Sequence, residues 1–313
     1  MTATIDLPAG VGGPATVEEY RQAWDAQDVG VEARTFWSET LRRFLRNKLG
    51  VASLVILLLL VGGAVFAPWI TSYDPLVGTP ADRLQGLFSP GYILGTDEQG
   101  RDILARILYG GRLSLVAAFV PPLIATVVGT LIGTWAGFIR GPIGNGIMRA
   151  VDMLYAFPAI LLAIAVGASL GPGLKNTIIA VSIVFVPPIA RVADAAARTV
   201  ALQEYMEAAR LSGASRWRLL RTQLLPNVLN QILVYSSGLV GVSMIIAASL
   251  SFLGLGSQPP APEWGYMLNS MRGSIYVQPW VVVVPGLFIF ITSVAFNMAS
   301  DALRESMDSR SDV

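Results

Sequence analysis

Long apolar stretches alternate with short polar ones along most of this chain. A helix that crosses a bilayer needs about 20 mostly apolar residues, and the uncharged stretches fit that requirement. We expect six membrane-spanning helices, over 49–72, 113–139, 153–174, 176–190, 229–253 and 273–300. The fourth stretch is the shortest and needs the stems of Lys175 and Arg191 to reach the membrane surface. The pattern predicts an all-α, polytopic membrane protein.

The basic residues predict the direction of these spans. Of the 22 lysines and arginines, 16 lie before the first span, between spans two and three, between spans four and five, or after the sixth. Basic residues collect on the cytoplasmic side of a membrane protein, so we expect both termini in the cytoplasm. Without the fourth span the two largest basic clusters would fall on opposite faces, so the charges also favour that helix.

Composition agrees with a membrane protein and excludes several kinds of chemistry. Only 14% of the residues are charged, whereas soluble domains carry about 25%. The net charge of +1 gives no indication of nucleic-acid binding. The chain has no Cys and no His, which removes thiol nucleophiles, Ser-His triads and the commonest transition-metal ligand. Its two lysines, Lys48 and Lys175, lie outside any P-loop motif, so we expect no ATP, metal or other cofactor on this chain.

The ends of the chain differ from the spans. Residues 1–35 lack the pattern of a cleaved signal peptide, and we expect a mobile cytoplasmic tail. Residues 36–48 place apolar side chains on one helical face and basic ones around it, which predicts an interfacial amphipathic helix. A basic flank that merely orients the first span is compatible with the same pattern. Residues 302–313 are expected to form a cytoplasmic C-terminal tail.

The segment 73–111 is expected outside the membrane, with a short helix of its own. Thr96 and Gln99 have the spacing of a capping box. Two acid-first pairs at i,i+4 favour the helix: Asp97 with Arg101, and Asp102 with Arg106. The helix could be a structural lid or could contact a partner. The candidate residues for either role are Asp97, Gly100, Arg101, Asp102 and, from the turn-rich loop 257–273, Trp264, which could equally be an interfacial anchor.

A charged stretch, residues 201–226, interrupts the apolar pattern between the fourth and fifth spans. Gly213 allows the chain to reverse, Ser215 is placed to cap a second helix, and Pro226 marks the start of the fifth span. The first helix, 201–211, is expected to bury Leu202, Met206 and Ala209.

Two other interpretations of this stretch exist. A DNA-binding helix–turn–helix is permitted by the residues, but the unit is tied to membrane spans at both ends and lacks a dominant basic stripe. A plain solvated loop needs neither two helices nor a reversal between them.

The residues of this stretch resemble a known family. Glu207-Ala208-Ala209, Gly213 and Leu225-Pro226 have the spacing of the cytoplasmic loop of ATP-binding cassette (ABC) importer permeases. Four further stretches resemble the C-type subunit of the dipeptide/oligopeptide branch: 94–115, 148–164, 249–268 and 296–308. The resemblance covers nearly everything after the N-terminal tail. Gln223, Met298 and Ala299 depart from the residues usual in the family.

The resemblance implies a type I ABC importer transmembrane fold with its permease core at 112–301. It implies a non-catalytic permease subunit for di- or oligopeptides, or alternatively for nickel chelates, haem or another small solute. The implied partners are a second permease chain, one or two ATPase subunits that carry ATP and Mg, an extracytoplasmic substrate-binding protein and the lipid of the bacterial cytoplasmic (inner) membrane. It places ATPase coupling at Glu207, Ala208, Ala209, Gly213, Ala214, Trp217, Arg218, Leu225 and Pro226.

Two rival classes differ in what they require. A stand-alone channel or secondary transporter usually has ionisable groups inside its spans, and the uncharged stretches that define these spans have none. An intramembrane enzyme has few candidate groups without His, Cys or paired acids. Uptake by the chain alone would favour the first rival, and substrate turnover by the chain would favour the second.

Overall fold

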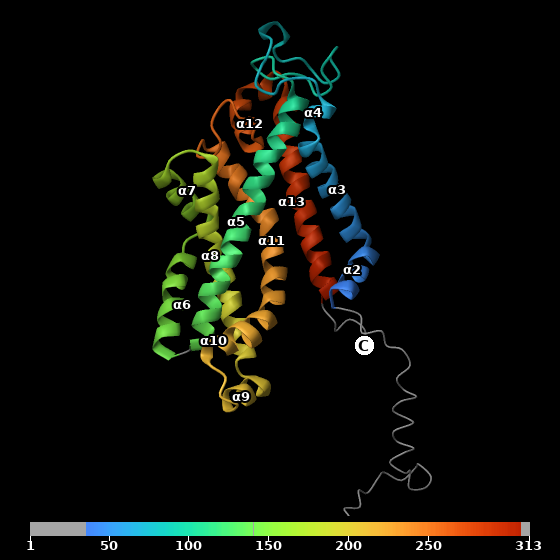
Figure 1. Ribbon diagram of the computed structural model, residues 1–313. Helices are drawn as coiled ribbons and strands as arrows, with labels where there is room; N and C mark the ends of the chain where they lie inside the picture. The colour runs from blue at the N-terminus through green and yellow to red at the C-terminus, as the bar shows by residue number, and fades with distance from the viewer. Residues whose placement is uncertain (1–35, 140, 308–313) are drawn as a thin grey trace, which may run out of the picture.

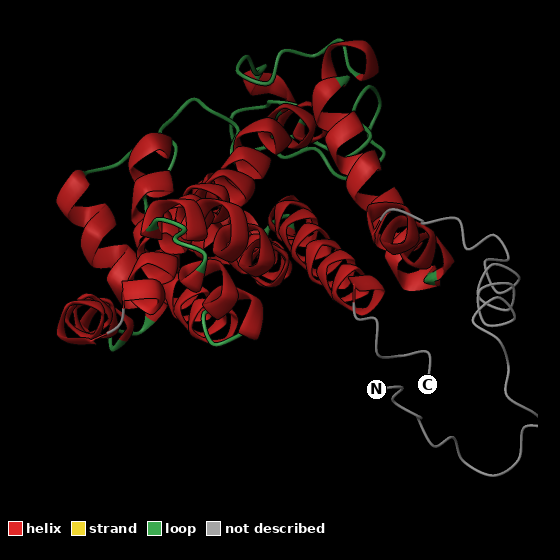
Figure 2. Ribbon diagram, turned by 60° about the horizontal axis from the view of Figure 1, so that its bottom comes forward, coloured by secondary structure: helices red, strands yellow, loops and turns green. Residues whose placement is uncertain are grey.

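A computed structural model describes residues 36–139 and 141–307, and in these residues every regular element is a helix (Figures 1 and 2). The tail expected over 1–35 and the end of the C-terminal tail, 308–313, lie outside the described residues. The long helices form one elongated bundle with α4 and α12 at one end and α9 and α10 at the other (Figure 1). We call these the α12 end and the α9 end.

The elements follow one another in the order α2 (Phe36–Arg46), α3 (Lys48–Val65), α4 (Ala67–Ile70), η1 (Pro80–Asp82), α5 (Ile103–Ile139), α6 (Gly141–Tyr155), α7 (Ala159–Leu170), α8 (Leu174–Val200), α9 (Glu204–Leu211), α10 (Arg216–Leu219), η2 (Leu220–Leu224), α11 (Leu225–Phe252), α12 (Trp264–Ser270), η3 (Arg272–Tyr276) and α13 (Pro279–Met307).

Five helical stretches in the described part of the chain are long and apolar enough to cross a membrane: α3, α5, α8, Arg216–Phe252 and α13. The pair formed by α6 and α7 raises the number to six when it is counted as one broken span. The prediction of an all-α polytopic protein is therefore confirmed, whereas the form of several spans differs from the sequence expectation.

The third span is not the single helix expected over 153–174. That stretch is divided between α6 and α7, which meet at an angle of 89°. Pro158 lacks an amide hydrogen and restricts the residue before it to extended conformations, so the helix ends at Tyr155 and restarts at Ala159. A search for uncharged stretches of sequence cannot detect such a break.

The fourth span is much longer than the expected 176–190. Helix α8 continues to Val200 and includes Arg191, Asp194 and Arg198. Asp194 accepts hydrogen bonds from the Nε of Arg198 at 2.9 and 3.0 Å, and Arg191 pairs with Asp152 of α6. Because these charges are compensated in pairs, they do not end the helix.

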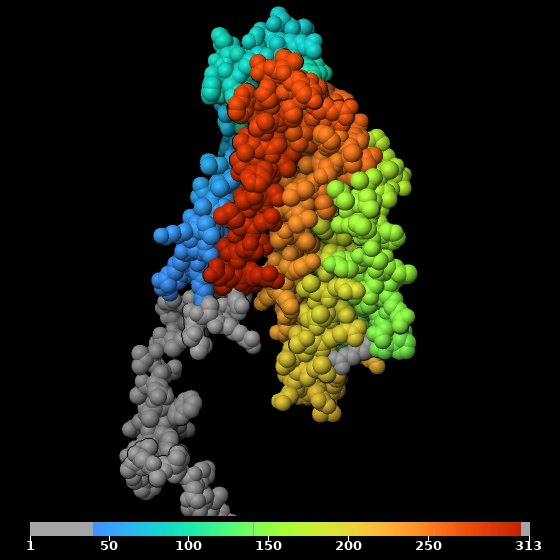
Figure 3. All heavy atoms as spheres, turned by 180° about the vertical axis from the view of Figure 1, so that it is seen from behind, coloured from blue at the N-terminus to red at the C-terminus, as the bar shows by residue number. Residues whose placement is uncertain are grey.

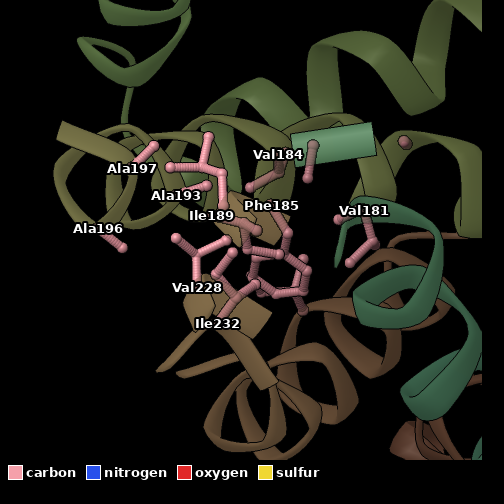
Figure 4. Packing of buried hydrophobic residues seen from close by; sticks show 14 of the residues in the cluster. Val181, Val184, Phe185, Ile189, Ala193, Ala196, Ala197, Val228 and Ile232 are labelled. Carbon is pink, nitrogen blue, oxygen red and sulfur yellow. The ribbon is translucent and has the colours of Figure 1, made fainter. Parts of the chain in front are cut away.

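Helix α8 packs on α5 and α11. Three glycines of α5 at i,i+4 spacing face it: Gly129, Gly133 and Gly137. A Cβ on Gly133 would overlap the carbonyl oxygen of Ala190, so the two backbones approach as closely as small residues allow. Phe185 and Ile189 of α8 also lie close to Val228 and Ile232 of α11 (Figure 4).

The segment 71–102 does not contain the expected helix from the Thr96 capping box. Helix α5 begins only at Ile103, and Asp102 caps it by accepting the Ala105 N–H at 2.7 Å. Thr96 instead accepts the Gln85 N–H and donates to the carbonyl of Asp82. The helix therefore begins directly after Asp102, and Thr96 pairs with the distant residues Asp82 and Gln85 instead of capping a helix of its own.

The loop before the sixth span contains a helix that the turn-rich sequence concealed. Glu263 is 2% exposed and caps α12 by accepting the N–H groups of Gly265 and Tyr266 at 2.9 Å. The expected span at 273–300 begins later, at Pro279, and α13 extends to Met307.

Candidate functional site

The stretch 201–226 forms two short helices joined by a defined reversal. Helix α9 ends in a Schellman motif: the Gly213 N–H donates to the carbonyl of Arg210 at 3.0 Å and the Ala214 N–H to that of Ala209 at 3.2 Å. Gly213 has a φ of +81° and no atom near its missing Cβ, so the conformation and not the space requires glycine. Ser215 Oγ then accepts the Arg218 N–H at 3.3 Å and caps α10, as expected.

The reversal is anchored to the bundle by buried apolar side chains. Met206 and Leu224 are fully buried, and Leu219 nearly so, in the cluster that α8 and α11 form. Arg210 lies over the ring of Phe138 in α5, 6.0 Å from its centroid. Because three long helices hold the unit, it moves with the ends of those helices and not as a free loop.

The tip of this unit, residues 202–218, projects beyond the other described segments at the α9 end (yellow in Figure 3). Leu202 was expected to be buried but is 73% exposed, because it lies in the turn before α9 and not on the packed face. Leu211 is 85% exposed, and Tyr205 is exposed on the same short helix. The sequence analysis did not single out Leu211 or Tyr205. A bulky apolar residue two positions before a glycine that ends a helix is the signal that could have indicated the exposure of Leu211.

The nine residues named for coupling fall into two groups. Those with an exposed position are Glu207, Ala208, Gly213, Trp217, Arg218 and Pro226, and those packed partly inward are Ala209, Ala214 and Leu225. Trp217 also lines a cavity of about 560 Å³ together with Trp135 of α5 and Arg221. The first group is therefore the more accessible to another chain at the α9 end or its flank.

Pro226 lies in the first turn of α11, as expected, but it does not interrupt the helical backbone before it. The helix is continuous from Arg216 to Phe252, and Pro226 lies inside it. Residues Leu220–Leu224 widen into a π-helical turn, in which the Leu225 N–H donates to the carbonyl of Leu220. Because Pro226 has no N–H for the carbonyl four residues earlier, a wider turn accommodates the missing donor.

At the α12 end, the five residues named for a lid or a partner contact are not exposed. Asp97 is 1% exposed and accepts the Nε of Arg101 at 2.7 Å. Gly100 has a φ of +73° and its missing Cβ faces the carbonyl oxygen of Thr79. Asp102 and Trp264 are buried against α5. The expected Asp102–Arg106 pair does not form, since Arg106 instead lies 3.5 Å from Asp97 and donates to the carbonyl of Pro75 at 2.8 Å. These contacts support a structural lid.

Among residues 36–139 and 141–307, no three His, Cys, Asp or Glu side chains are close enough to hold a metal ion.

Comparison with known proteins identifies the class to which this fold and loop belong. Residues 129–313 match the model of the binding-protein-dependent transport system inner membrane component, and residues 35–86 match the N-terminal transmembrane domain of oligopeptide transport permease C. The chain belongs to the family of binding-protein-dependent transport permeases of ABC importers.

Curated relatives carry a more particular name. A glutathione transport system permease protein GsiD of Pectobacterium atrosepticum is 43% identical over 275 residues, which cover 88% of this chain and 91% of the relative. GsiD proteins of Escherichia coli reach the same identity over 277 residues. Among solved structures, inward-facing conformations of the MetNI methionine ABC transporter match with a TM-score of 0.50 and 18% identity, over 64% of this chain and 96% of that chain. The last likeness shows the fold alone.

The chain is therefore a multi-pass inner-membrane permease subunit of an ABC importer, which is a non-catalytic subunit. An importer of this kind comprises a partner permease, an ATPase and a binding protein.

Proposed function

We propose that this permease imports peptide-like solutes, that is, di- or oligopeptides or small peptides such as glutathione. The observation that carries the proposal is the 43% identity to glutathione transport permeases over 88% of the chain. The match of residues 35–86 to oligopeptide permease C supports the same class. Glutathione and short peptides share a free carboxylate, a free ammonium group and amide bonds, so one pathway chemistry serves both.

The test is uptake by the complete importer in cells that lack other peptide importers. Radiolabelled glutathione, a dipeptide, a pentapeptide, a nickel chelate and haem are supplied one at a time. We expect ATP-dependent uptake of at least one peptide, abolished when the binding protein is deleted. Uptake of only nickel chelate or haem would replace the proposed substrate with the alternative, and uptake without the ATPase would favour a secondary transporter.

We propose further that the tip, residues 202–218, is the surface on which the ATPase acts. The exposed residues Leu211, Glu207 and Arg218 offer apolar and charged groups together, as interfaces with aromatic or aliphatic anchors and polar rims do. The buried Met206 and Leu224 join this tip to α8 and α11. ATP-driven closure of the ATPases then moves the tip, which transmits the movement to the bundle as a rigid body and favours one of two states.

Substitutions at the tip test this coupling. In Gly213→Trp and Glu207→Arg we expect membrane insertion and assembly with the partner permease to persist while uptake is lost and ATP hydrolysis no longer responds to the loaded binding protein. Gly254→Trp is the matched control, because Gly254 has a φ of +82° and open space around it but lies beyond the opposite end of α11. Unchanged uptake in both tip variants would contradict the coupling role.

The proposed coupling requires the α9 end to face the cytoplasm. The basic residues predict that direction. Because the chain has no cysteine, a single Gly213→Cys variant reports sidedness directly. We expect an impermeant thiol reagent to label this introduced thiol only in inverted vesicles, and its labelling in intact spheroplasts would refute the orientation.

A further inference from the structure

A pair of opposite charges lies beside the broken third span, away from both ends of the bundle. Arg191 Nε donates to Asp152 Oδ1 at 2.9 Å, and Nη2 lies 2.8 Å from the same oxygen. The guanidinium group stands 5.2 Å from the centroid of the Tyr155 ring. At 1.5 Å per residue, Arg191 lies about 14 Å inside the Val200 end of α8 and about 26 Å from the Leu174 end. Helix α8 has 27 residues and is about 40 Å long, so a hydrocarbon core of about 30 Å centred on it includes Arg191.

The side chains of this pair are half exposed, Arg191 by 51% and Asp152 by 43%. Charged groups at membrane depth face a bundle interior or a water-filled cavity, because a lipid environment does not solvate them. The buried pairs of this chain behave differently, since Asp97 and Arg101 are almost completely enclosed by protein. The exposed side of the Asp152–Arg191 pair therefore suits water or a partner chain and not lipid.

The backbone next to the pair leads to the same conclusion. All eight residues from 153 to 160 are exposed, and they include the non-helical segment between Tyr155 and Ala159. Irregular backbone at membrane depth is tolerated only where protein covers it or where it lines a water-filled cavity. Helices α6 and α7 lie at one edge of the bundle in both Figure 1 and Figure 3, so this chain leaves their outer face open. Discontinuous helices also commonly border the substrate path of transporters.

We propose that Asp152, Tyr155 and Arg191 line the translocation pathway and bind the charged ends of a zwitterionic, peptide-like substrate as it passes. Arg191 takes the carboxylate and Asp152 takes the ammonium group. The assignment of these ligands rests on the proposed function, whereas the placement on the pathway does not.

The chemistry of the pair suits transient binding. With no substrate present, the two side chains neutralise one another. A zwitterion replaces their single ion pair with two ion pairs and leaves no net charge in the pathway. Half-exposed ion pairs are individually weak, so the exchange is reversible in both directions. A cation–π contact with the Tyr155 ring holds the Arg191 guanidinium group in place while its carboxylate partner changes from Asp152 to the substrate.

Placement on the pathway is tested by cysteine labelling in the complete importer. Ala156→Cys lies in the open break, and Leu59→Cys is the control, because Leu59 is 70% exposed on the wholly apolar middle of α3. We expect a charged, water-soluble thiosulfonate to modify the thiol introduced at position 156 and not the thiol introduced at position 59. An unreactive thiol at position 156 would overturn the proposal, because the break would then face lipid or a tight protein contact.

The ligand role is tested by uptake of a peptide that the wild-type importer carries. We expect Arg191→Gln and Asp152→Asn each to lower uptake by about tenfold or more, as loss of a charge-assisted hydrogen bond does, without lowering the melting temperature of the assembly. Arg191→Lys should retain part of the uptake. In the charge-swapped variant, Asp152→Arg with Arg191→Asp, uptake should stay low because the peptide ends meet like charges.

The outcomes separate the two proposals. Restored uptake in the charge-swapped variant, or losses that follow a lowered melting temperature, would show a structural ion pair and overturn the ligand role. Failure of the wild-type importer to carry any peptide would refute the proposed substrate class. Labelling at position 156 depends on neither result, because it reports water and not peptide.

Discussion

The indole N–H of Trp264 donates to the carbonyl of Ile107 at 2.9 Å, and this contact fastens α12 to the first turns of α5. The main-chain N–H of Trp264 donates to Ser114 Oγ at 3.0 Å, and Ser114 Oγ in turn donates to Glu263 Oε1 at 3.0 Å. Gly110 makes room for this arrangement, because a Cβ there would overlap the carbonyl oxygen of Pro262. The α12 end is thus held by a buried polar network, whereas the α9 end is held by apolar side chains.

Trp264→Phe keeps most of the ring volume and removes the indole donor. We expect a loss of about 1 kcal/mol in stability, the net value of a typical hydrogen bond, whereas Trp264→Ala should cost about 3–5 kcal/mol because it also leaves a cavity. Thermal unfolding of the detergent-solubilised importer measures both. Trp69→Phe is the matched control, since Trp69 is 79% exposed, and an equal loss there would remove the significance of the Ile107 contact.

Asp102 gives a pH-dependent prediction. Burial raises the pKa of the Asp102 carboxyl above its ordinary value of 3.8, against the opposing hydrogen bonds from Ala105 and Leu104. The folded state therefore binds this proton more tightly than the unfolded state, and the resulting contribution to stability is present at acid pH and is lost as pH rises through the folded pKa.

Replacing Asp102 tests both its charge and its cap. Asp102→Asn keeps a capping oxygen without a charge, so its stability relative to wild type should improve from acid to neutral pH. Asp102→Ala also loses the cap, which is worth about 1 kcal/mol, and its cost relative to wild type should likewise fall from acid to neutral pH. Melting curves of the solubilised importer at several pH values check this, and an Asn variant that loses ground as pH rises would contradict the direction of the shift.

Gly133 tests the contact between α5 and α8. Gly133→Val has to displace the Ala190 backbone, and overpacking of this kind costs about 1–3 kcal/mol. Gly146→Val is the control, because Gly146 lies in α6 with no atom within 4 Å of its missing Cβ. We expect the first variant to lower the yield of assembled importer and the second to leave it near wild type. Equal yields would show that the two helices can separate at no cost.

Asn47 links the start of α3 to the last turns of α13. Its Oδ1 caps α3 by accepting the N–H groups of Leu49 and Gly50 at 3.0 Å, and its Nδ2 donates to Glu305 of α13 at 2.8 Å. Asn47→Ala should cost about 1 kcal/mol through the lost cap. Asn47→Asp keeps the cap but faces Glu305 with a like charge, so adding Glu305→Gln should recover the difference. If Glu305→Gln does not restore stability, the contact with Glu305 contributes nothing and Asn47 acts only as the cap of α3.

The lengths of the spans show where sequence reasoning stopped. Charge-free stretches located the apolar parts of α3, α5, α11 and α13, because burial in lipid requires them. The same criterion shortened α8 at Arg191, since it could not show that Asp152 of another helix compensates that charge. It also joined the end of α6 to α7 across Pro158, because hydropathy does not show where a helix changes direction.

At the two ends of the bundle, predictions from neighbouring residues were correct and predictions that depended on distant segments were wrong. The reversal at Gly213 and the cap at Ser215 were predicted correctly, since both depend on residues a few positions apart. The burial of Leu202 and the capping box at Thr96 were predicted wrongly, because each depended on which distant segment lies opposite. Leu202 is left largely uncovered, and Thr96 pairs with Gln85 and Asp82.

The sequence by itself determined that the chain is a helical membrane protein with a charged reversal between its last spans, because hydropathy, glycine conformation and helix capping are local properties. The tertiary structure alone decided which charges meet. Asp152 and Arg191 are far apart in sequence, and only the break at Pro158 and the full length of α8 bring them together. Electrostatic partners at such separations depend on packing, which no window of sequence contains.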